Sequence, residues 1–338
     1  MHGLVGVLLS SLGAGASVVC TPGFYAPNFF DWLKTFRPTW YSAVPTMHQA
    51  ILARTEANSK IIAYCPLRLI RSSSAPMPTQ VMMELEKAFN APVIESYSMT
   101  EAAHQMTSNP LSHQRKPGSV GIAAGPEVAI MDQAGNLLSP EEIGEVVIRG
   151  ANVTKAYENN PEANESAFTK GWFRTDDLGY LDSDGYLFLK GRIKETINRG
   201  GEKIFPREVD EVLQNHPAVE QVVTFAAPHT LLGEEVAAAI VLKENVSATE
   251  QEIKEFVAQK LADFKVPRVV LFVDEIPKGP TGKLQRIGLA QKLGLRASDP
   301  TAKRPEFALS RTAGEEQLVN IWTEILGVSP IGINVPLI

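Results

Sequence analysis

The sequence contains little cysteine, with only Cys20 and Cys65 among its 338 residues. Two thiols cannot form a disulfide framework or a four-thiolate zinc site, and such usage is typical of a reducing, cytoplasmic setting. Basic residues are outnumbered, because 32 Lys and Arg face 38 Asp and Glu, for a net charge of −6. This balance argues against a polyanion-binding surface along the whole chain, so we expect no nucleic-acid partner.

Long apolar runs are also absent. The run at residues 4–12 is too short to span a membrane. No Lys or Arg precedes it, as a signal peptide would require, since the first is Lys34. We therefore expect no membrane partner, and we expect a buried helix here with a buried strand over residues 17–21. A chain that opens within a buried helix suggests that the polypeptide starts inside a domain.

The remaining composition is ordinary for a globular protein, with 44% hydrophobic and 21% charged residues, and the length is typical of two or three domains. Strand and helix patterns alternate in the first half, which predicts an α/β (α+β) fold with a partly parallel sheet. The predicted strands cover residues 67–71, 92–95, 128–131, 145–148, 186–189, 219–225, 235–242 and 269–273. The predicted helices cover residues 78–89, 206–215, 249–261, 283–293 and 314–327, and Thr249 with Glu252 forms a capping box.

Four short segments combine residue types that carry chemistry: YSMTE at 97–101, FRTDDLGY at 173–180, GRIKETINRGGEKI at 191–204 and PKGPTGKLQR at 277–286. Each alone has a structural explanation, such as a hairpin or a turn with solvated acids. The last segment is not a Walker-type phosphate loop, because Pro277 stands in place of the first glycine and Leu284 in place of the final serine or threonine.

Together and in this order, the four segments resemble the adenylate-forming superfamily, which contains acyl-CoA synthetases, luciferases and peptide-synthetase adenylation domains. Phrases such as RKPGSVG, NVTKAYENNPEAN and INRGGEKIFPREVDEVL are most similar to its oxalate–CoA ligase branch. The resemblance implies a ligase that joins a carboxylic acid to ATP, releases pyrophosphate and passes the acyl group to CoA. It implies ATP, Mg²⁺ and CoA as cofactors, and a small acid such as oxalate as substrate.

The resemblance also divides the chain into parts. Residues 1–191 match an AMP-binding large domain without its N-terminal part, and residues 192–295 match a small lid domain that rotates between the two half-reactions. Residues 296–338 resemble a linker and the first helix of a truncated phosphopantetheine carrier domain. The family's Ser/Thr/Gly-rich phosphate loop has no match in these 338 residues. We therefore expect a fragment that exposes apolar surface and aggregates or dimerises when alone.

The matched positions imply roles in activation of the acid. Thr100 would bind phosphate, Glu101 would hold Mg²⁺ against the phosphates, and Lys283 would bridge the acid and the phosphate as a flexible point charge. Tyr97 would stack on adenine and Asp177 would bind ribose. The full set of implied nucleotide contacts is Ser74, Ala75, Pro76, Tyr97, Asp177 and Arg192.

Other matched positions imply roles in domain rotation, thiol entry and acid recognition. Lys194 is the implied hinge. The implied CoA path runs along Gly200, Gly201, Glu202 and Lys203, where paired glycines allow close approach of a pantetheine arm. The implied acid contacts are Ser72, Ser74 and His104. An alternative for His104 is structural packing beside the Thr-Glu loop.

Two departures from the family pattern bear on these roles. Asp176 stands where the family has Gly, which places a second negative charge beside Asp177, and Phe205 stands where we expect Ser.

Two other functions remain open: an adenylation domain that loads a carrier protein, and a non-catalytic remnant. The implied macromolecular partner is accordingly a carrier protein or the missing N-terminal half.

Overall fold

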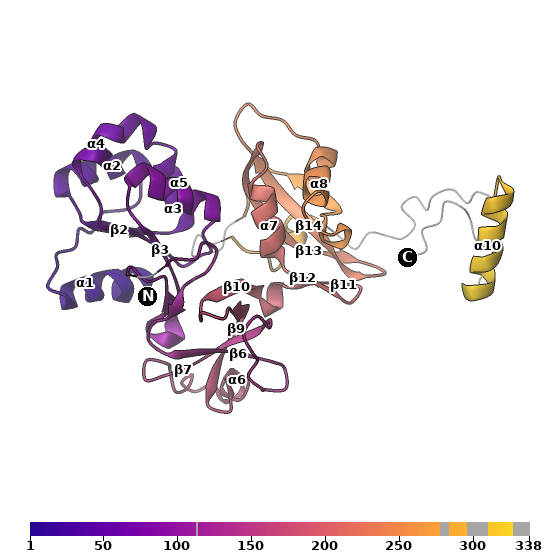
Figure 1. Cartoon of the computed structure of the whole chain (residues 1–338), viewed down its shortest axis with the longest axis horizontal. Coiled ribbons are helices and arrows are strands. Elements are labelled where there is room, and N and C mark those ends of the chain that lie inside the picture. The colour runs from indigo at the N-terminus through magenta and orange to yellow at the C-terminus, as the bar shows by residue number, and fades with distance from the viewer. Residues whose placement is uncertain (113, 278–283, 296–309, 327–338) are drawn as a thin grey trace. The chain divides into compact units, whose positions relative to one another are not determined.

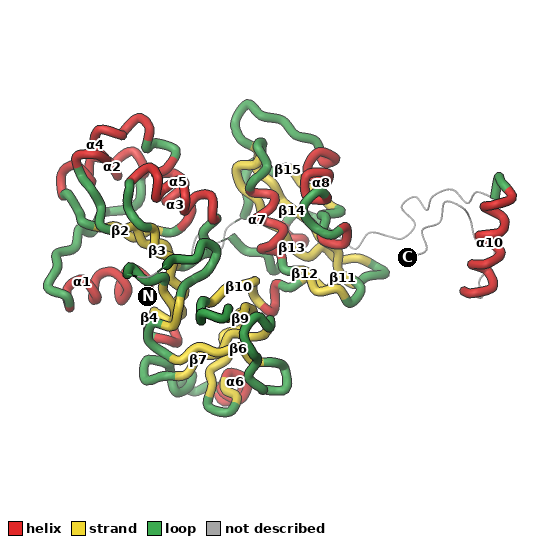
Figure 2. Tube along the Cα trace, viewed as in Figure 1, coloured by secondary structure: helices red, strands yellow, loops and turns green. Residues whose placement is uncertain are grey.

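The computed structural model describes the chain except for residues 113, 278–283, 296–309 and 327–338. The described chain divides into two compact units (Figure 1). The first contains Met1–Thr196 and Phe205–Asn215, and the second contains Ile197–Ile204 and His216–Pro277 together with the described residues from Gln285 on. Both units combine helices with sheets, which confirms the mixed α/β class predicted from the sequence (Figure 2).

The first sheet of the first unit has the order β1-β2-β3-β4-β5. Its strands are β1 (Trp40–Ala43), β2 (Leu69–Ser73), β3 (Val93–Met99), β4 (His104–Ser108) and β5 (Ile122–Ala123). The pairs β1–β2 and β2–β3 are parallel, and the pairs β3–β4 and β4–β5 are antiparallel. This arrangement confirms the partly parallel sheet, and it brings the carboxyl ends of β1, β2 and β3 to one edge.

Helices cover one face of this sheet (Figure 1). They are α2 (Ala26–Phe36), α3 (Pro45–Leu52), α4 (Ser59–Tyr64) and α5 (Thr79–Phe89), with the short turn η2 (Glu56–Asn58) between two of them. Phe30 and Leu33 from α2 and Leu85 from α5 pack with Ile70 of β2 and Val93 of β3 in the core. The predicted helix over residues 78–89 corresponds to α5.

The N-terminal segment differs from the prediction. It forms a wide, π-type helical segment η1 (His2–Leu9) that continues into α1 (Ser10–Gly13). No residue of η1 is buried, and Leu4, Leu9 and Leu12 are each more than half exposed. Residues 17–21 form no strand. The expected buried helix and buried strand are therefore wrong, because this segment meets the sheet along one side only, and its other side is the exposed apolar surface that we expected.

The second sheet of the first unit is antiparallel and has the order β10-β9-β7-β6, with β8 paired to β9. Its strands are β6 (Glu127–Met131), β7 (Gly144–Arg149), β8 (Phe168–Thr169), β9 (Trp172–Leu181) and β10 (Leu187–Arg192). The helix α6 (Pro161–Ala167) precedes β8, and the Asn160 side chain caps it. Short turns η3 (Thr100–Ala102) and η4 (Ile193–Glu195) follow β3 and β10, and α7 (Pro206–Gln214) also belongs to this unit.

The second unit is built on a sheet of order β12-β11-β14-β13, with β15 parallel to β14. Its strands are β11 (Ile197–Arg199), β12 (Glu202–Ile204), β13 (Val219–His229), β14 (Gly233–Leu242) and β15 (Val269–Phe272). The predicted capping box of Thr249 and Glu252 opens α8 (Glu250–Ala258), and η5 (Asp263–Lys265) precedes β15.

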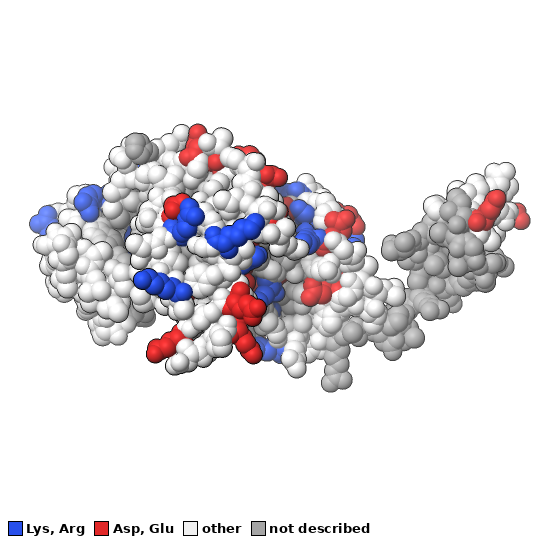
Figure 3. All heavy atoms as spheres, turned by 90° about the horizontal axis from the view of Figure 1, so that it is seen from below, with Lys and Arg blue, Asp and Glu red and all other residues white. Residues whose placement is uncertain are grey.

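Two later helices complete the described chain. The helix predicted over residues 283–293 is reduced to α9 (Leu289–Lys292), because Gly288 before it has a positive φ of 75° that a continuous helix excludes. The final predicted helix is α10 (Ala313–Leu326). None of the helices in the described ranges is long and apolar enough to cross a membrane. On the face shown in Figure 3, basic and acidic side chains lie close to one another.

Candidate active site

Asp177 on β9 is the most completely oriented carboxylate among the predicted site residues. The antiparallel register places Arg192 of β10 directly opposite Asp177, and Arg192 Nε donates to Asp177 Oδ1 over 3.1 Å. Tyr97 on β3 donates its hydroxyl hydrogen to Asp177 Oδ2 in a short hydrogen bond. Burial raises the pKa of Asp177, and the hydrogen bond from Tyr97 and the charge of Arg192 oppose that rise. The structure therefore brings these three predicted nucleotide contacts together.

Tyr97 is fixed as a hydrogen-bond donor. Burial, and then the charge of Asp177, raise the pKa of Tyr97 well above its usual range. The ring packs against two apolar clusters, one that contains Met106 and Phe173 and one that contains Val120, so the side chain has little freedom to turn. A neutral phenol in this position orients the carboxylate by donating a hydrogen bond and adds no charge of its own.

Asp176 occupies a backbone position that suits glycine. Its φ is 61°, in the left-handed region, where a side chain costs free energy and glycine does not. Its backbone N–H donates to Glu145 Oε1 over 3.0 Å, and its carboxylate pairs with Lys194 over 2.9 Å. The side chains of Asp176 and Lys194 are each more than half exposed. Asp177 is nevertheless positioned, because its N–H donates to Thr175 Oγ1 over 3.2 Å.

Glu101 lies in η3, the turn that joins β3 to β4. Tyr157 donates its hydroxyl hydrogen to Glu101 Oε1 over 3.0 Å, and the Thr154 N–H donates to the Glu101 carbonyl over 2.7 Å. Burial and the nearby Glu101 raise the pKa of Tyr157 to about 12. The second carboxylate oxygen has no partner among the described residues, and Thr100 beside it is exposed. A single oriented carboxylate of this kind fits a Mg²⁺ ion whose other ligands are phosphate and water oxygens.

A second polar group, the acid-site cluster, lies on the sheet face opposite helices α2–α5. It consists of His2, Ser42, Arg71, Ser74 and His104. His2 Nδ1 contacts Ser74 Oγ at 2.9 Å, and His2 Nε2 contacts Ser42 Oγ at 2.6 Å. Arg71 Nη2 donates to His104 Nε2 over 2.8 Å, and the rings of His2 and His104 stack with centroids 5.8 Å apart. The sheet register places Ser42 opposite Arg71.

Strain marks two members of this cluster. Ser74, just past the end of β2, has a φ of 76°, and His104, at the start of β4, has a φ of 97°. Non-glycine residues adopt such values only where their surroundings impose them. Ala75 and Pro76 follow Ser74 and are exposed at the same edge of the sheet, so the predicted adenine wall lies open to solvent.

Ser72 does not join the acid-site cluster. Side chains alternate along a strand, so Ser72 shares its sheet face with Ile70, which packs in the helix-covered core. Ser72 is fully buried, and its hydroxyl has no hydrogen-bond partner within the described part of the chain. Ser74 and His104 therefore lie together as predicted, whereas Ser72 points to the other face. Its assignment to the acid stays a prediction that this geometry does not favour.

The predicted CoA loop lies in the second unit as the two-residue turn of a β11–β12 hairpin. Gly200 and Gly201 have φ values of 58° and 103°, and Arg199 pairs with Glu202 across the turn. The Gly200 N–H donates to the Leu232 carbonyl over 3.0 Å. The Gly201 N–H donates to Asn198 Oδ1 over 3.0 Å. Both glycines are exposed, so a ligand can approach their backbone closely, and the side chains of Glu202 and Lys203 are exposed as well.

The remaining predicted residues lie elsewhere. Lys194 is in η4, two residues before the boundary of the first unit at Thr196. Phe205 is the half-buried residue that precedes α7. Lys283 lies outside the described residues, so its assigned role stays a prediction.

Sequence reasoning missed several residues that the fold adds to the site. They are His2, Ser42 and Arg71 in the acid-site cluster, and Tyr157 beside Glu101. Arg71 gave a usable signal, because a charged residue within the apolar segment LRLIR is either at a sheet edge or buried for a reason. His2, Ser42 and Tyr157 gave none, since their partners are 40 or more residues away.

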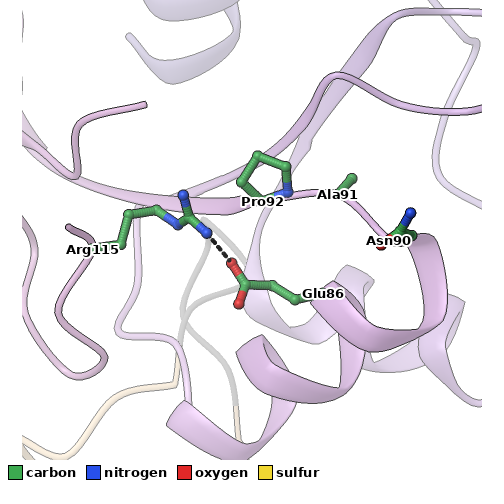
Figure 4. Close-up of a pocket in the computed structure, with 5 residues that line it drawn as sticks. All are labelled: Glu86, Asn90, Ala91, Pro92 and Arg115. Atoms are coloured by element: carbon green, nitrogen blue, oxygen red, sulfur yellow. Dashed lines mark hydrogen bonds and ion pairs between the residues drawn. The ribbon is translucent and has the colours of Figure 1, made fainter. Parts of the chain in front are cut away.

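A surface hollow of about 260 Å³ lies away from these groups and is lined by Glu86, Asn90, Ala91, Pro92 and Arg115 (Figure 4). Arg115 Nη2 donates to Glu86 Oε1 over 3.2 Å, and the Val93 N–H donates to the same oxygen over 2.8 Å. The Glu86 carboxylate thus accepts one hydrogen bond from the first backbone N–H of β3 and one from Arg115. These contacts give Glu86 a structural role.

Comparison with known proteins gives consistent matches. Residues 1–158 match the family of AMP-binding enzymes, and residues 208–283 match the C-terminal domain of AMP-binding enzymes. An oxalate–CoA ligase of Arabidopsis thaliana is 52% identical over 295 residues, and one of Saccharomyces cerevisiae is 47% identical over 294. Each match covers 86% of this chain, and the chain spans 57% and 53% of these two relatives.

Solved structures agree with the sequence matches. ATP-bound MatB from Rhodopseudomonas palustris superposes with a TM-score of 0.79 at 31% identity, over 86% of this chain and 57% of that one. An o-succinylbenzoate coenzyme A synthetase from Bacillus subtilis, in complex with ATP and magnesium, superposes with a TM-score of 0.73 at 33% identity. That match covers 83% of this chain and 57% of the other.

Proposed function

Because the chain belongs to the AMP-binding enzyme family, we propose that it binds ATP and a small carboxylic acid as part of an AMP-forming acid–CoA ligase. An oxygen of the acid attacks the α-phosphorus of ATP, and pyrophosphate leaves with the electrons of the broken P–O bond. The CoA sulfur, after losing its proton, then attacks the acyl carbon, and AMP leaves. The observation that carries the proposal is Asp177, held between Tyr97 and Arg192. A carboxylate oriented in this way can accept hydrogen bonds from both hydroxyls of a ribose.

The surrounding residues suit the rest of the nucleotide. The exposed residues Ala75 and Pro76 and the half-buried Ser74 offer one wall for adenine at the edge of the sheet, with the Tyr97 ring assigned to the other side. Thr100 offers an exposed hydroxyl to the phosphates, and Arg192 can extend its guanidinium to phosphate while Nε holds Asp177. Positioning two anions and neutralising their charge is the main requirement of this reaction.

Glu101 is the residue that we assign to magnesium, through the carboxylate oxygen that Tyr157 does not bind. When bound, the ion supplies positive charge to the phosphate oxygens and the leaving pyrophosphate. Lys283 is assigned to bridge the acid and the α-phosphate in the first half-reaction. Gly200 and Gly201 are assigned to the pantetheine arm of CoA in the second half-reaction, with Lys194 as the hinge between the two states.

We propose oxalate as the preferred acid. Two relatives that are 52% and 47% identical to this chain over the aligned residues are named oxalate–CoA ligases. The acid-site cluster is polar, with two serine hydroxyls, two imidazoles and one guanidinium. A polar site of this composition favours a small charged acid over a long-chain acid.

The proposal also covers the cellular location of the protein and its partner. Two thiols in 338 residues favour a cytoplasmic location. Since the chain spans a little over half of its relatives, we propose that activity requires a partner segment equivalent to the N-terminal half of those proteins. A carrier protein in place of free CoA is the alternative acceptor.

The test measures AMP release by the purified chain with Mg²⁺, ATP and CoA, over oxalate, malonate, succinate and hexanoate. It is run alone and with the N-terminal half of the Arabidopsis relative added in trans. Binding of a fluorescent ATP analogue is measured in parallel for the parent, for Asp177→Asn, and for the control Asp31→Asn on the exposed surface of α2.

We expect oxalate-dependent AMP release and ATP-analogue binding that Asp177→Asn weakens about 10- to 100-fold, the range for a lost charge-assisted hydrogen bond. Asp31→Asn should bind like the parent. Equal binding by the parent and by Asp177→Asn would refute the nucleotide site. A chain that binds nucleotide but releases no AMP with any acid, with or without the added half, would favour the non-catalytic alternative.

A further inference from the structure

Arg71 is a buried cation without an acidic partner. Only 8% of the residue is exposed. Its guanidinium contacts the Gly6 carbonyl, Ser96 Oγ, His104 Nε2 and Gln105 Oε1 at 2.8–3.3 Å, and all four groups are neutral. No carboxylate in the described part of the chain forms an ion pair with it, and burial lowers its pKa. Because a buried charge without a counter-charge is costly, Arg71 needs an explanation.

The contact with Arg71 fixes the proton of His104. A guanidinium can only donate hydrogen bonds, so His104 Nε2 is the acceptor over 2.8 Å. Burial, and then the charge of Arg71, lower the pKa of His104 to about 4, so the ring is neutral at pH 7. Its single hydrogen therefore lies on Nδ1. That nitrogen has no hydrogen-bond partner among the described residues, which leaves it available to donate to a ligand.

Arg71 is also the only cationic side chain of the acid-site cluster at neutral pH. Burial, and then Arg71, lower the pKa of His2 to about 4 as well. Both ring nitrogens of His2 are committed to serine hydroxyls, those of Ser42 and Ser74. The cluster thus combines several neutral hydrogen-bonding groups with the positive charge of Arg71 behind them, and the amino group of Met1 adds a second positive charge nearby.

We propose that Arg71 makes the acid site selective for acids that keep a second carboxylate, by supplying this charge and by holding His104 as an Nδ1–H donor. The inference rests on the proposed function, because it assigns how that ligase selects its acid. The reacting carboxylate loses its charge when it becomes an acyl phosphate. The distal carboxylate of a diacid stays negative, accepts the His104 Nδ1–H, and is attracted by the Arg71 charge across the His104 ring.

The charge sets the size of the expected preference. A positive charge one imidazole ring away from a carboxylate favours its binding by about 100-fold at the effective dielectric of a partly buried site. Oxamate provides the comparison, since it has nearly the shape of oxalate but carries an uncharged amide in place of one carboxylate. Arg71 should therefore distinguish oxalate from oxamate, whereas a merely structural Arg71 would affect both ligands equally.

The experiment measures equilibrium binding of oxalate and oxamate to the purified chain by calorimetry, for the parent, Arg71→Gln and Arg71→Lys. We expect the parent to prefer oxalate by about 100-fold. Arg71→Gln should lose this preference and keep oxamate binding within about threefold, and Arg71→Lys should retain most of the preference because it keeps the charge. A second measurement on the parent, nitrogen-15 NMR of imidazole, should show His104 neutral with an unprotonated Nε2 at pH 7.

Each outcome decides the inference. A preference that survives in Arg71→Gln, an equal loss of both ligands, or no binding of either by the parent would overturn it. Should Arg71→Gln not fold, the parent spectrum decides, because a protonated Nε2 or an imidazolium at pH 7 would contradict the tautomer. Absence of AMP release in the presence of selective oxalate binding would instead count against the proposed ligase reaction and leave the role of Arg71 supported.

Discussion

Two glycines of the N-terminal helical segment η1 should respond to the same substitution with opposite signs. A Cβ added at Gly6 would lie 2.2 Å from His104 Nε2 and 2.9 Å from Arg71 Nη1, whereas a Cβ at Gly3 would have no heavy atom within 4 Å. Alanine in a helix is more favourable than glycine by about 0.5–1 kcal/mol. Gly3→Ala should therefore stabilise the chain by up to this amount.

Gly6→Ala should instead destabilise the chain. His104 is 2% exposed and held by Arg71, so it cannot move by the ångström or more that the new methyl group requires. Forcing extra atoms into a packed site costs about 1–3 kcal/mol, which exceeds the gain in helix propensity. Because the gain in helix propensity is common to both substitutions, we expect the two variants to differ by the packing cost, about 1–3 kcal/mol.

Urea unfolding followed by circular dichroism measures this difference, and the nitrogen-15 resonances of His104 report whether Gly6→Ala displaces the ring. Equal stabilisation by the two substitutions would refute the packing of η1 on the acid-site cluster. That result would also contradict the hydrogen bond from Arg71 to the Gly6 carbonyl.

Three further predictions concern other sites. Asp176→Gly should stabilise the chain by about 0.5–1 kcal/mol in urea unfolding, because glycine adopts the positive φ of this position without strain. Loss of the exposed ion pair with Lys194 should reduce this gain only slightly. The substitution should also lower the pKa of Asp177, which the Asp176 charge raises. Burial lowers the pKa of His48 to about 4, so the unfolded chain binds more protons at this group between pH 6.5 and 4. As the pH drops through this window, His48 should contribute up to about 3 kcal/mol to the loss of stability, beside the contributions of His2 and His104. His48→Asn should remove its share of the fall in the urea midpoint. Gly201→Ala, at a φ of 103°, should cost about 1–2 kcal/mol and reduce hydrogen-exchange protection in the β11–β12 hairpin, and full protection would contradict the strained turn.

The fold was most predictable where pattern and burial agree. The apolar segments at residues 67–71 and 92–95 correspond to β2 and β3, and the capping box opened α8 as expected. The strand β9 (Trp172–Leu181) was missed, because its centre carries Arg174, Asp176 and Asp177, and such residues are unfavourable in strands when read alone. Their charges are met by Glu145, Lys194 and Arg192, which no local pattern reveals.

The site was predictable only in part for the same reason. Motif order indicated Asp177, Tyr97 and Glu101, but it carried no information on which face of a strand a residue occupies. Ser72 and Ser74 are two positions apart, yet Ser72 is enclosed in the core and Ser74 contacts His2. Arg71 could be identified as a candidate only from the structure, in which β2 lies between β1 and β3 and the Gly6 carbonyl of the N-terminal segment contacts the Arg71 guanidinium.

The pairing of Arg192 with Asp177 has a consequence for how this protein can change in evolution. Turns between antiparallel strands usually tolerate insertions and deletions. Here the turn at residues 182–186, together with the bulge at Lys190, sets the register that places Arg192 opposite Asp177, and with the bulge unchanged a shift of one residue would turn Arg192 to the other face of the sheet. The length of a distant surface turn is thus constrained by the nucleotide site, so we expect sequence drift at residues 183–185 without change in their number.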